Sequence, residues 1–329
     1  MNSIRECAVV GYGSWATTLV GQLTRKGITV HWHVTNPEVT EGILSEGRNP
    51  KYVSDMELDT KLLVISDDIN ETVRDCEFVI LACPSAFLKK VLEPLTEELG
   101  SKYIISAIKG IVPDEYCTVL EYIHFMYGLS FKQLGVIAGP THAEEVSRGR
   151  LSFLTAAGAS DETNARIAEM LESESLRIDT SRDIYGIEYA SVLKNIYAIA
   201  AGIAAGLGYG DNYIAVLITT CAAEMERFLN ESYPFERNTN SRAYLGDLLV
   251  TCYSNYSRNR RLGSLIGRGC TVKSAMNEMT MVAEGYYGAS CIKKASYRKQ
   301  ISMPIADMVF SILYEKASPR KAMKALELR

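Results

Sequence analysis

Lys194 is the only formally charged residue between Glu188 and Asp211, and it stands in an apolar run that predicts a long helix. A buried ammonium is costly unless it is paired or deprotonated, so this lysine indicates either chemistry or a compensating partner. On a helix, its side is lined by small residues and the opposite side by bulky ones, which suggests an adjoining space for a polar ligand. Two structural alternatives stay open: the lysine snorkels to the surface, or it pairs with a core carboxylate. The small residues are Ala190, Ala198, Ala201 and Ala205, and the bulky ones are Val192, Ile196, Ile199 and Ile203.

A glycine-rich turn lies between a strand-like run at Cys7–Val10 and a helix-compatible segment at Thr17–Lys26, and it has the pattern G-x-G-x-x-A. Gly11 permits the tight turn, Gly13 lets the backbone approach a pyrophosphate, and Ala16 allows close helix packing. The following helix N-terminus attracts the anion. This context predicts binding of a dinucleotide, NAD(H) or NADP(H).

The end of the second predicted strand reads His33-Val34-Thr35-Asn36, with neither the acid typical of NAD sites nor the arginine typical of NADP sites. Asn36 is a candidate for a hydrogen bond to a ribose hydroxyl, and His31 or His33 for an approach to a phosphate. The preference between the two cofactors therefore stays open. The two histidines also resemble a metal pair, but no third ligand is evident, and we predict no metal site.

Polar residues follow several other predicted strands, where open parallel sheets bind their ligands. Lys109 comes directly after the fifth strand, with a surface lysine in a turn as the structural alternative. Cys83-Pro84-Ser85 follows the fourth. Gly139 and Pro140 fix a turn after the sixth, and Thr141 is expected to cap the next helix.

The second half of the chain carries a candidate anion site at Ser257-Arg258-Asn259-Arg260-Arg261. Ser257 can cap a helix whose first amides point outward, and the guanidinium of Arg258 can grip a phosphate through paired hydrogen bonds. A plain basic helix start is the alternative for this group. Asp247 is a candidate partner for Lys194 or for a substrate hydroxyl, with a simple helix or turn cap as its alternative.

Apolar strand-like runs alternate with helix-compatible segments in the first half of the chain, which predicts a mostly parallel sheet. After about Arg182 the chain becomes helical. We therefore expect an α/β fold with a Rossmann-type sheet domain at residues 1–183 and an all-helical substrate domain at residues 184–329, each contributing to one cleft. The predicted strands are Cys7–Val10, Ile28–Trp32, Leu62–Ile65, Phe78–Ala82, Tyr103–Ala107 and Leu134–Ala138, with Ser152–Ala156 and Leu176–Ile178 as extensions. The predicted helices of the second half are Ile187–Ala205, Asn212–Leu229, Arg258–Ile266, Thr271–Asn277, Ala289–Ser296 and Ile305–Tyr314.

Composition narrows the function classes. Hydrophobic residues make up 47% and charged residues 22% of the 329 residues, as in globular proteins, and the net charge of −4 argues against nucleic-acid binding. The eight cysteines form no C-x-x-C pair, so neither a zinc motif nor a disulfide framework is predicted. The N-terminus lacks the pattern of a signal peptide, and glycines with Asp211 interrupt the longest apolar run. We expect a cytoplasmic protein without a membrane span.

Together these segments resemble bacterial NAD(P)-dependent glycerol-3-phosphate dehydrogenase, from the glycine turn almost to the C-terminal helices. The resemblance implies reversible reduction of dihydroxyacetone phosphate, a phosphorylated triose, by NADH or NADPH to sn-glycerol 3-phosphate for phospholipid synthesis. It leaves a homodimer as a possible assembly. The matching segments are Gly11–Thr17, Ser106–Gly110, Gly139–Val146, Leu193–Gly202, Gly206–Asn212, Gly246–Thr251, Ser257–Gly263 and Glu284-Gly285.

The resemblance also implies roles for single residues. Lys194 matches the catalytic lysine, which donates a proton during reduction and accepts one in the reverse reaction. The matched substrate positions are Lys109, Gly139, Thr141, Lys194, Asn195, Asp247, Thr251, Ser257, Arg258 and Asn259, of which the last three form the phosphate segment. The cofactor positions are Gly11, Gly13, Ser14, Trp15, Ala143, Val282 and Glu284, with Asn36, Lys109 and Arg258 as further candidates.

Three segments depart from the family pattern. Thr35-Asn36 stands where many relatives carry arginine, which puts a strong preference for NADP in doubt. Ile218-Thr219-Thr220 lacks a charge that relatives usually have, and Ala243-Tyr244-Leu245 replaces a more glycine-rich stretch. Two other functions stay open: a related hydroxyacid dehydrogenase, because a guanidinium binds carboxylates as well as phosphates, and a nucleotide-sensing regulator without turnover.

Overall fold

The computed structural model describes residues 4–279 and 281–326 and divides into two compact units. The first comprises residues 1–108 and 119–184, and the second residues 109–118 and 185–329. The segment 109–118 lies in the second unit, whereas the expected division after residue 183, which stays a prediction, would place it in the first. This segment is a small hairpin of β6 (Ile111–Val112) and β7 (Cys117–Thr118), so the second unit is not all-helical.

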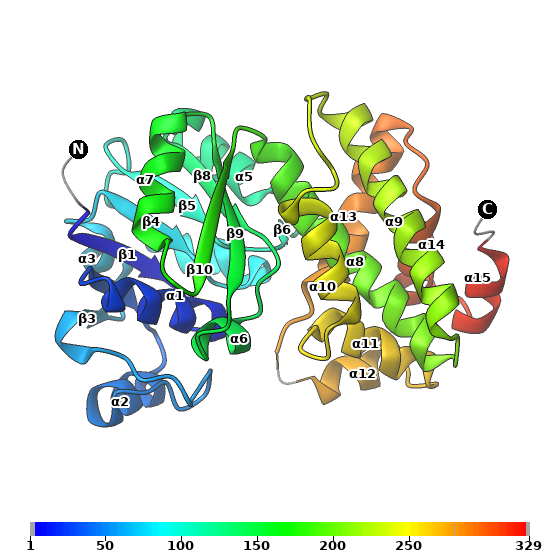
Figure 1. Ribbon diagram of the computed structural model, residues 1–329, viewed down its shortest axis with the longest axis horizontal. Helices are drawn as coiled ribbons and strands as arrows, with labels where there is room; N and C mark the ends of the chain where they lie inside the picture. The colour runs from blue at the N-terminus through cyan, green and yellow to red at the C-terminus, as the bar shows by residue number, and fades with distance from the viewer. Residues whose placement is uncertain (1–3, 280, 327–329) are drawn as a thin grey trace. The chain divides into compact units, whose positions relative to one another are not determined.

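An eight-stranded sheet forms the first unit, with the strand order β10-β9-β8-β5-β4-β1-β2-β3 (Figure 1). Neighbouring strands are parallel except for the antiparallel pair β8–β9. The expectation of a mostly parallel sheet, extended by two further strands, is confirmed. The strands are β1 (Glu6–Val10), β2 (Thr29–His33), β3 (Leu63–Ser66), β4 (Phe78–Leu81), β5 (Tyr103–Ser106), β8 (Leu134–Ala138), β9 (Ser152–Gly158) and β10 (Leu176–Ser181).

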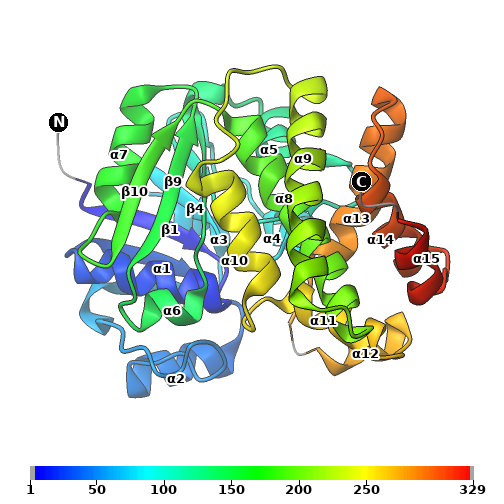
Figure 2. The ribbon, with the colours of Figure 1, turned by 45° about the vertical axis from the view of Figure 1, so that its right-hand side comes forward.

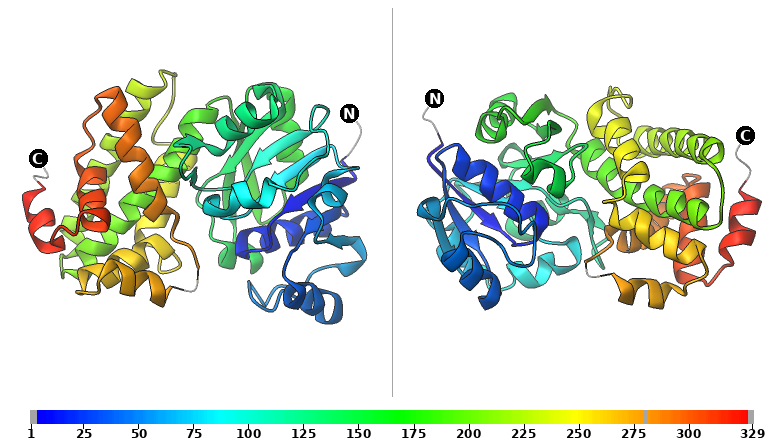
Figure 3. Two further views of the ribbon diagram at one scale, coloured as in Figure 1. Left: turned by 180° about the vertical axis from the view of Figure 1, so that it is seen from behind. Right: turned by 60° about the horizontal axis from the view of Figure 1, so that its bottom comes forward.

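Helices cover both faces of this sheet, which explains why its central strands are continuous apolar runs rather than alternating ones (Figures 1 and 3). Val9 and Ile80 belong to the core that α1 and α7 cover. Val10 and Leu81 face the other side, together with residues of α3, α4 and α5. The helices are α1 (Ser14–Arg25), α2 (Pro37–Glu46), α3 (Ile69–Val73), α4 (Leu88–Leu92), α5 (Val119–Tyr127), α6 (Ala143–Ser147) and α7 (Asp161–Leu171), with 3-10 turns at Thr60–Leu62, Ser85–Phe87 and Phe131–Gln133.

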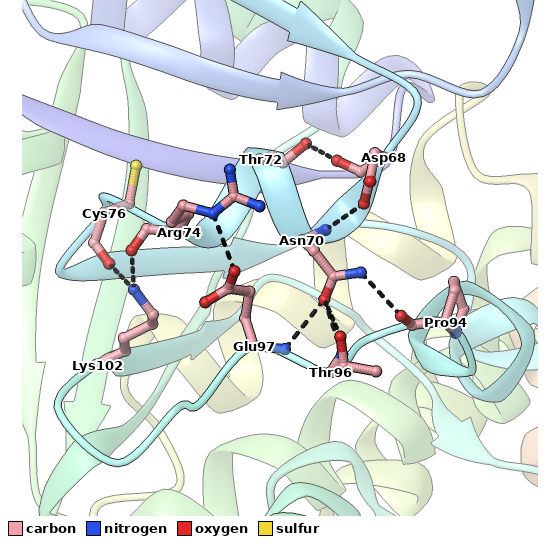
Figure 4. Close-up of polar contacts among 9 residues, drawn as sticks. All are labelled: Asp68, Asn70, Thr72, Arg74, Cys76, Pro94, Thr96, Glu97 and Lys102. Carbon is pink, nitrogen blue, oxygen red and sulfur yellow. Dashed lines mark hydrogen bonds and ion pairs between the residues drawn. The ribbon is translucent and has the colours of Figure 1, made fainter.

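The segment that leads into β5 is held against α3 by polar side chains (Figure 4). The side-chain oxygen of Asn70 accepts hydrogen bonds from the amides of Thr96 and Glu97 at 2.7 and 3.0 Å. Lys102 is buried, and its ammonium donates to the carbonyls of Arg74 and Cys76 at 2.7 and 3.0 Å. These contacts satisfy carbonyls at the end of a short helix and fix the entry of β5, the strand that precedes Lys109.

The second unit is built around α8 (Ile184–Gly206), which α9, α10, α11 and α13 surround (Figure 2). Within the described residues, no helix is both long enough and apolar enough to cross a bilayer. The other elements are α9 (Asp211–Ser232), a π-helical turn (Arg242–Gly246), α10 (Asp247–Tyr253), α11 (Arg258–Gly267), α12 (Val272–Glu278), α13 (Glu284–Lys299), α14 (Pro304–Tyr314) and α15 (Pro319–Ala325).

Glycines bring α8 and α11 into contact backbone to backbone. A Cβ added at Gly202 would lie 2.1 Å from the carbonyl oxygen of Arg260, and one at Gly263 would lie 2.1 Å from that of Ile199. The same close approach recurs one turn further along, where a Cβ added at Gly206 or at Gly267 would lie 2.4 Å from a carbonyl oxygen of the other helix. The two helices therefore share an interface that tolerates only hydrogen at these four positions.

Candidate active site

Lys194 is buried in the middle of α8 and is only 3% exposed. Its ammonium donates a hydrogen bond to Oδ1 of Asp247, the first residue of α10, at 2.5 Å. The alternative of a lysine that snorkels to the surface is therefore wrong, and Asp247 is confirmed as its partner. Asp247 is only 1% exposed, so burial brings two opposite charges together in a setting where neither is stable alone.

A second ammonium approaches the same carboxylate. Nζ of Lys109 lies 3.6 Å from Oδ2 of Asp247, an oxygen that accepts no hydrogen bond from the described residues. The hydroxyl of Thr251 donates to the backbone carbonyl of Asp247 at 2.6 Å and lies 3.5 Å from its Oδ1. Two lysines thus share the buried carboxylate of Asp247. A structural ion pair would need only one of these two positive charges.

This arrangement acts directly on the proton affinity of Lys194. Burial lowers its pKa from 10.5 to about 7, the attraction of Asp247 opposes that change, and Lys109 adds to it. A lysine with a pKa near neutrality can both donate and accept a proton under ordinary conditions, as general acid–base catalysis requires.

A chain of hydrogen bonds through two asparagine side chains holds the segments around Lys194 in place. Asn195 donates to the carbonyl of Lys109 at 2.7 Å, and its side-chain oxygen accepts from Asn259 of α11 at 2.8 Å. The side-chain oxygen of Asn259 in turn accepts from the amide of Gly285 at 2.9 Å. Asn195 and Asn259, which both match substrate positions of the family, therefore hold Lys109, α8, α11 and α13 together.

The hairpin that follows Lys109 is fastened to α13 by an aromatic contact. Nζ of Lys294 lies 3.6 Å from the centre of the Tyr116 ring and also hydrogen-bonds to its hydroxyl. This contact explains why residues 109–118 pack with the helical unit, and sequence reasoning missed it.

The expected anion segment begins α11 as predicted. Ser257 is the N-cap, and its hydroxyl accepts a hydrogen bond from the amide of Arg260 at 3.2 Å. Arg260 bonds to Asn255 at 3.0 Å, and Arg261 pairs with Glu278 at 3.7 Å. Arg258 is half-buried in the first turn of α11, and its role as the anchor for an anion stays a prediction.

The glycine turn in the first unit has the form that a pyrophosphate needs. Gly11 has φ +112°, and a Cβ there would lie 2.8 Å from the amide nitrogen of Cys83. A Cβ at Gly13 would meet nothing within 4 Å, and no side chain caps α1. The indole nitrogen of Trp15 is buried without a hydrogen-bond partner among the described residues. Open space, uncapped amides and an unsatisfied donor fit a dinucleotide.

Two residues that sequence reasoning missed hold this turn. Trp32 donates from its indole to the carbonyl of Gly11 at 2.7 Å. Asn49, fully buried, donates to the carbonyl of Tyr12 at 3.1 Å and to the hydroxyl of Thr17 at 2.8 Å. The position of Trp32 at the end of a predicted strand was a usable signal, whereas nothing local to Asn49 reveals a contact so far along the chain.

The residues after β2 have structural partners. Asn36 caps α2, since its side-chain oxygen accepts from the amides of Glu38 and Val39 at 3.1 and 3.3 Å. His31 lies 3.3 Å from Glu6, and His33 lies 3.1 Å from the carbonyl of Asp67. A ribose contact by Asn36 stays a prediction. Residues 4–279 and 281–326 contain no cluster of three metal-ligating side chains.

Two expectations need correction. Thr141 is not a helix cap: α6 begins after His142, and the hydroxyl of Thr141 donates to the carbonyl of Gly139 at 3.2 Å. The turn is instead shaped by Gly139, which has φ +149° and no room for a Cβ beside the carbonyl of Phe153.

The small-residue stripe of α8 is also not an open wall. Ala190, Ala198 and Ala201 are fully buried, and Ala205 is half-buried. Small side chains here permit close packing rather than a space beside the lysine.

The remaining positions matched to the cofactor lie in both units and stay predictions. Ser14 and Ala143 are buried, and the carbonyl of Ala143 accepts a hydrogen bond from Thr18 at 3.3 Å. Val282 is half-buried and lies two residues before Glu284, the first residue of α13.

Comparisons with known proteins agree along the whole chain. The family model described as NAD-dependent glycerol-3-phosphate dehydrogenase N-terminus matches residues 6–165, and the corresponding C-terminus model matches residues 183–324. Glycerol-3-phosphate dehydrogenase [NAD(P)+] of Chlorobium limicola is 35% identical over 98% of this chain and 97% of its own. The enzyme of the same name from Pseudomonas aeruginosa is 33% identical over 96% and 92%. The crystal structure of glycerol-3-phosphate dehydrogenase from Coxiella burnetii is 28% identical, with a TM-score of 0.91 over 99% of both chains.

Proposed function

Because this chain belongs to the NAD-dependent glycerol-3-phosphate dehydrogenase family, we propose that Lys194 carries the proton in the reversible reduction of dihydroxyacetone phosphate to sn-glycerol 3-phosphate. The chain is an NAD(P)-dependent oxidoreductase that acts on a CH–OH group. The observation that carries the proposal is the buried Lys194–Asp247 pair, with Lys109 on the second carboxylate oxygen.

In reduction, the ammonium of Lys194 polarises the substrate carbonyl and donates its proton to the oxygen as the alcohol forms. In the reverse reaction the neutral amine accepts the alcohol proton. Asp247 keeps the amine oriented, and Lys109 supplies a second positive charge near the developing alkoxide. Oδ2 of Asp247, which lacks a hydrogen bond from the described residues, can accept one from a substrate hydroxyl.

The nicotinamide cofactor, when bound, supplies or accepts the hydride. Gly13 and the uncapped first turn of α1 would hold its pyrophosphate, and the indole of Trp15 would offer a donor. Ser14, Ala143, Val282 and Glu284 are proposed as further contacts. The cytoplasmic location expected from the sequence is tested by cell fractionation, and light scattering determines whether the protein forms a homodimer.

The direct test is the initial rate of NADH and NADPH oxidation by purified protein with dihydroxyacetone phosphate. Rates with a panel of 2-oxo acids test the alternative function of a hydroxyacid dehydrogenase. Sustained turnover would exclude a regulatory protein without catalysis. Turnover of 2-oxo acids in preference to the phosphorylated triose would overturn the proposal.

The two directions of the reaction should have opposite pH dependences. Burial lowers the pKa of Lys194 to about 7, so the ammonium that reduction needs is lost as pH rises above that value. The kcat/KM for reduction should fall about tenfold per pH unit on the alkaline side, and that for oxidation should fall on the acid side. Profiles measured between pH 6 and 9.5 check this. A reduction profile that stays flat to pH 9.5 would contradict the assignment of the proton donor.

The Arg258→Ala substitution should remove the anchor for the substrate phosphate. We expect the KM for dihydroxyacetone phosphate to rise about 10- to 100-fold, because a charge-assisted hydrogen bond of about 1.5–3 kcal/mol is lost. Arg261→Ala is the matched control, since that arginine of the same helix pairs with Glu278 at its surface. Equal KM values in the two variants would remove Arg258 from the phosphate site.

A further inference from the structure

The segment between β2 and β3 carries a charge pattern that bears on which dinucleotide the chain selects. Residues 36–59 contain six acidic side chains and two basic ones. Both basic side chains have carboxylate partners: Arg48 lies 2.5 Å from Glu57, and Lys51 lies 2.5 Å from Glu38. This segment therefore offers no excess positive charge to a phosphate.

In such a sheet the adenosine ribose of a dinucleotide is bound beside the end of β2, the strand next to β1. Glu38 stands in the first turn of α2, directly after the strand, and its amide donates to Asn36. Because Asn36 uses its side-chain oxygen as a cap, the carboxylate nearest the strand end in sequence is that of Glu38, which is exposed and paired with Lys51.

Lys51 is tied to the glycine turn from the other side. Its amide donates to the side-chain oxygen of Asn49 at 3.0 Å, and Asn49 donates to the carbonyl of Tyr12. The rings of Tyr12, in the turn, and of Tyr52, next to Lys51 in the chain, have their centres 6.4 Å apart. The salt bridge therefore links α2 to the turn that is shaped for the pyrophosphate.

We propose that Glu38, held by Lys51, makes this chain select NAD(H) over NADP(H). The carboxylate can accept hydrogen bonds from the ribose hydroxyls of NAD. The 2′-phosphate of NADP would add a charge of about −1.5 to −2 at pH 7 beside Glu38 and would compete with it for Lys51. The inference rests on the proposed function, because it assumes that the glycine turn binds the cofactor.

Binding of the two reduced cofactors to the full-length protein, without substrate, tests the proposal. The nicotinamide fluorescence of NADH and NADPH gives a Kd for each. We expect NADH to bind at least about tenfold more tightly than NADPH at low salt, and this ratio to shrink as salt screens the exposed carboxylates. An equal or tighter Kd for NADPH would overturn the proposal.

Three variants identify the responsible group. Glu38→Gln should lower the ratio of the NADPH Kd to the NADH Kd about fivefold or more, mainly through tighter NADPH binding. The substitution removes the repulsion between the carboxylate and the 2′-phosphate and releases Lys51. Lys51→Met should not lower this ratio. Glu57→Gln, which removes another exposed, salt-bridged acid from the same segment, should leave the ratio of the two Kd values unchanged.

The outcomes separate this inference from the proposed function. A narrower ratio in Lys51→Met would overturn the role of Glu38, because the loss of Lys51 leaves that carboxylate uncompensated beside the 2′-phosphate. An unchanged ratio in Glu38→Gln would do the same. Selective NADH binding without reduction of dihydroxyacetone phosphate would instead refute the proposed reaction and leave the selectivity standing.

Discussion

Replacing Lys194 with alanine is expected to lower kcat for the reduction of dihydroxyacetone phosphate by about 10²- to 10⁴-fold, the usual contribution of a general acid. The variant has no proton donor at the carbonyl, and Asp247 keeps only the more distant Lys109 as a positive neighbour. Binding of NADH should change little, because the glycine turn lies in the other unit. Single-turnover and steady-state rates at pH 7 measure the loss.

A buried carboxylate that loses its closest partner can also destabilise the protein, so the fold needs an independent check. Lys194→Met keeps most of the side-chain volume without the charge, and circular dichroism with thermal melting compares both variants with the parent. A small primary amine should partly restore turnover in Lys194→Ala, whereas a purely structural defect would not respond. Near-normal turnover in a folded Lys194→Met variant would refute the proton-transfer role.

The parts of the structure that the sequence predicted have local signals. The strands are apolar runs of the right length, and the turn after β1 needs glycine because of its φ and its contact with Cys83. Lys194 was conspicuous because the only other formal charge in its helix is Glu188, six residues earlier, but the sequence left both burial and snorkelling open. Asp247 could be named as a candidate partner for Lys194, although its segment alone also fitted a helix or turn cap.

The parts that could not be predicted depend on contacts between distant segments. Asn49 reaches the glycine turn from 37 residues away in sequence. Asp114 and Tyr116 adopt positive φ without being glycine, so the tight hairpin after Lys109 has no turn signature. Asn195 and Asn259 read as substrate ligands by resemblance, yet their side chains bond to each other at 2.8 Å.

The contact between the glycines of α8 and α11 could be predicted from the sequence only in part. Gly202 and Gly206 are four residues apart, as are Gly263 and Gly267, and this spacing places each pair on one helix face. The spacing predicts a close helix contact, but it does not name the partner helix. The structure shows that the two pairs meet each other.

Gly263→Ala should therefore be among the most destabilising single-methyl changes in this chain. Its Cβ would lie 2.1 Å from the carbonyl oxygen of Ile199, a backbone atom that can move only if α8 and α11 separate. We expect a loss of at least about 3 kcal/mol of stability, at the upper end for overpacked cores. For a domain of this size that corresponds to a fall in Tm of about 6–12 °C, measured by thermal melting.

The same separation should reach the catalytic residues, because Asn259 lies one helical turn before Gly263 and bonds to Asn195. Any Gly263→Ala protein that folds should therefore also lose turnover, and NADH binding should persist. Gly100→Ala is the matched control: its Cβ would meet nothing within 4 Å, and we expect its Tm to change by less than about 2 °C. If Gly263→Ala melted like this control, the backbone contact between α8 and α11 would be refuted, and with it the explanation for the paired glycines.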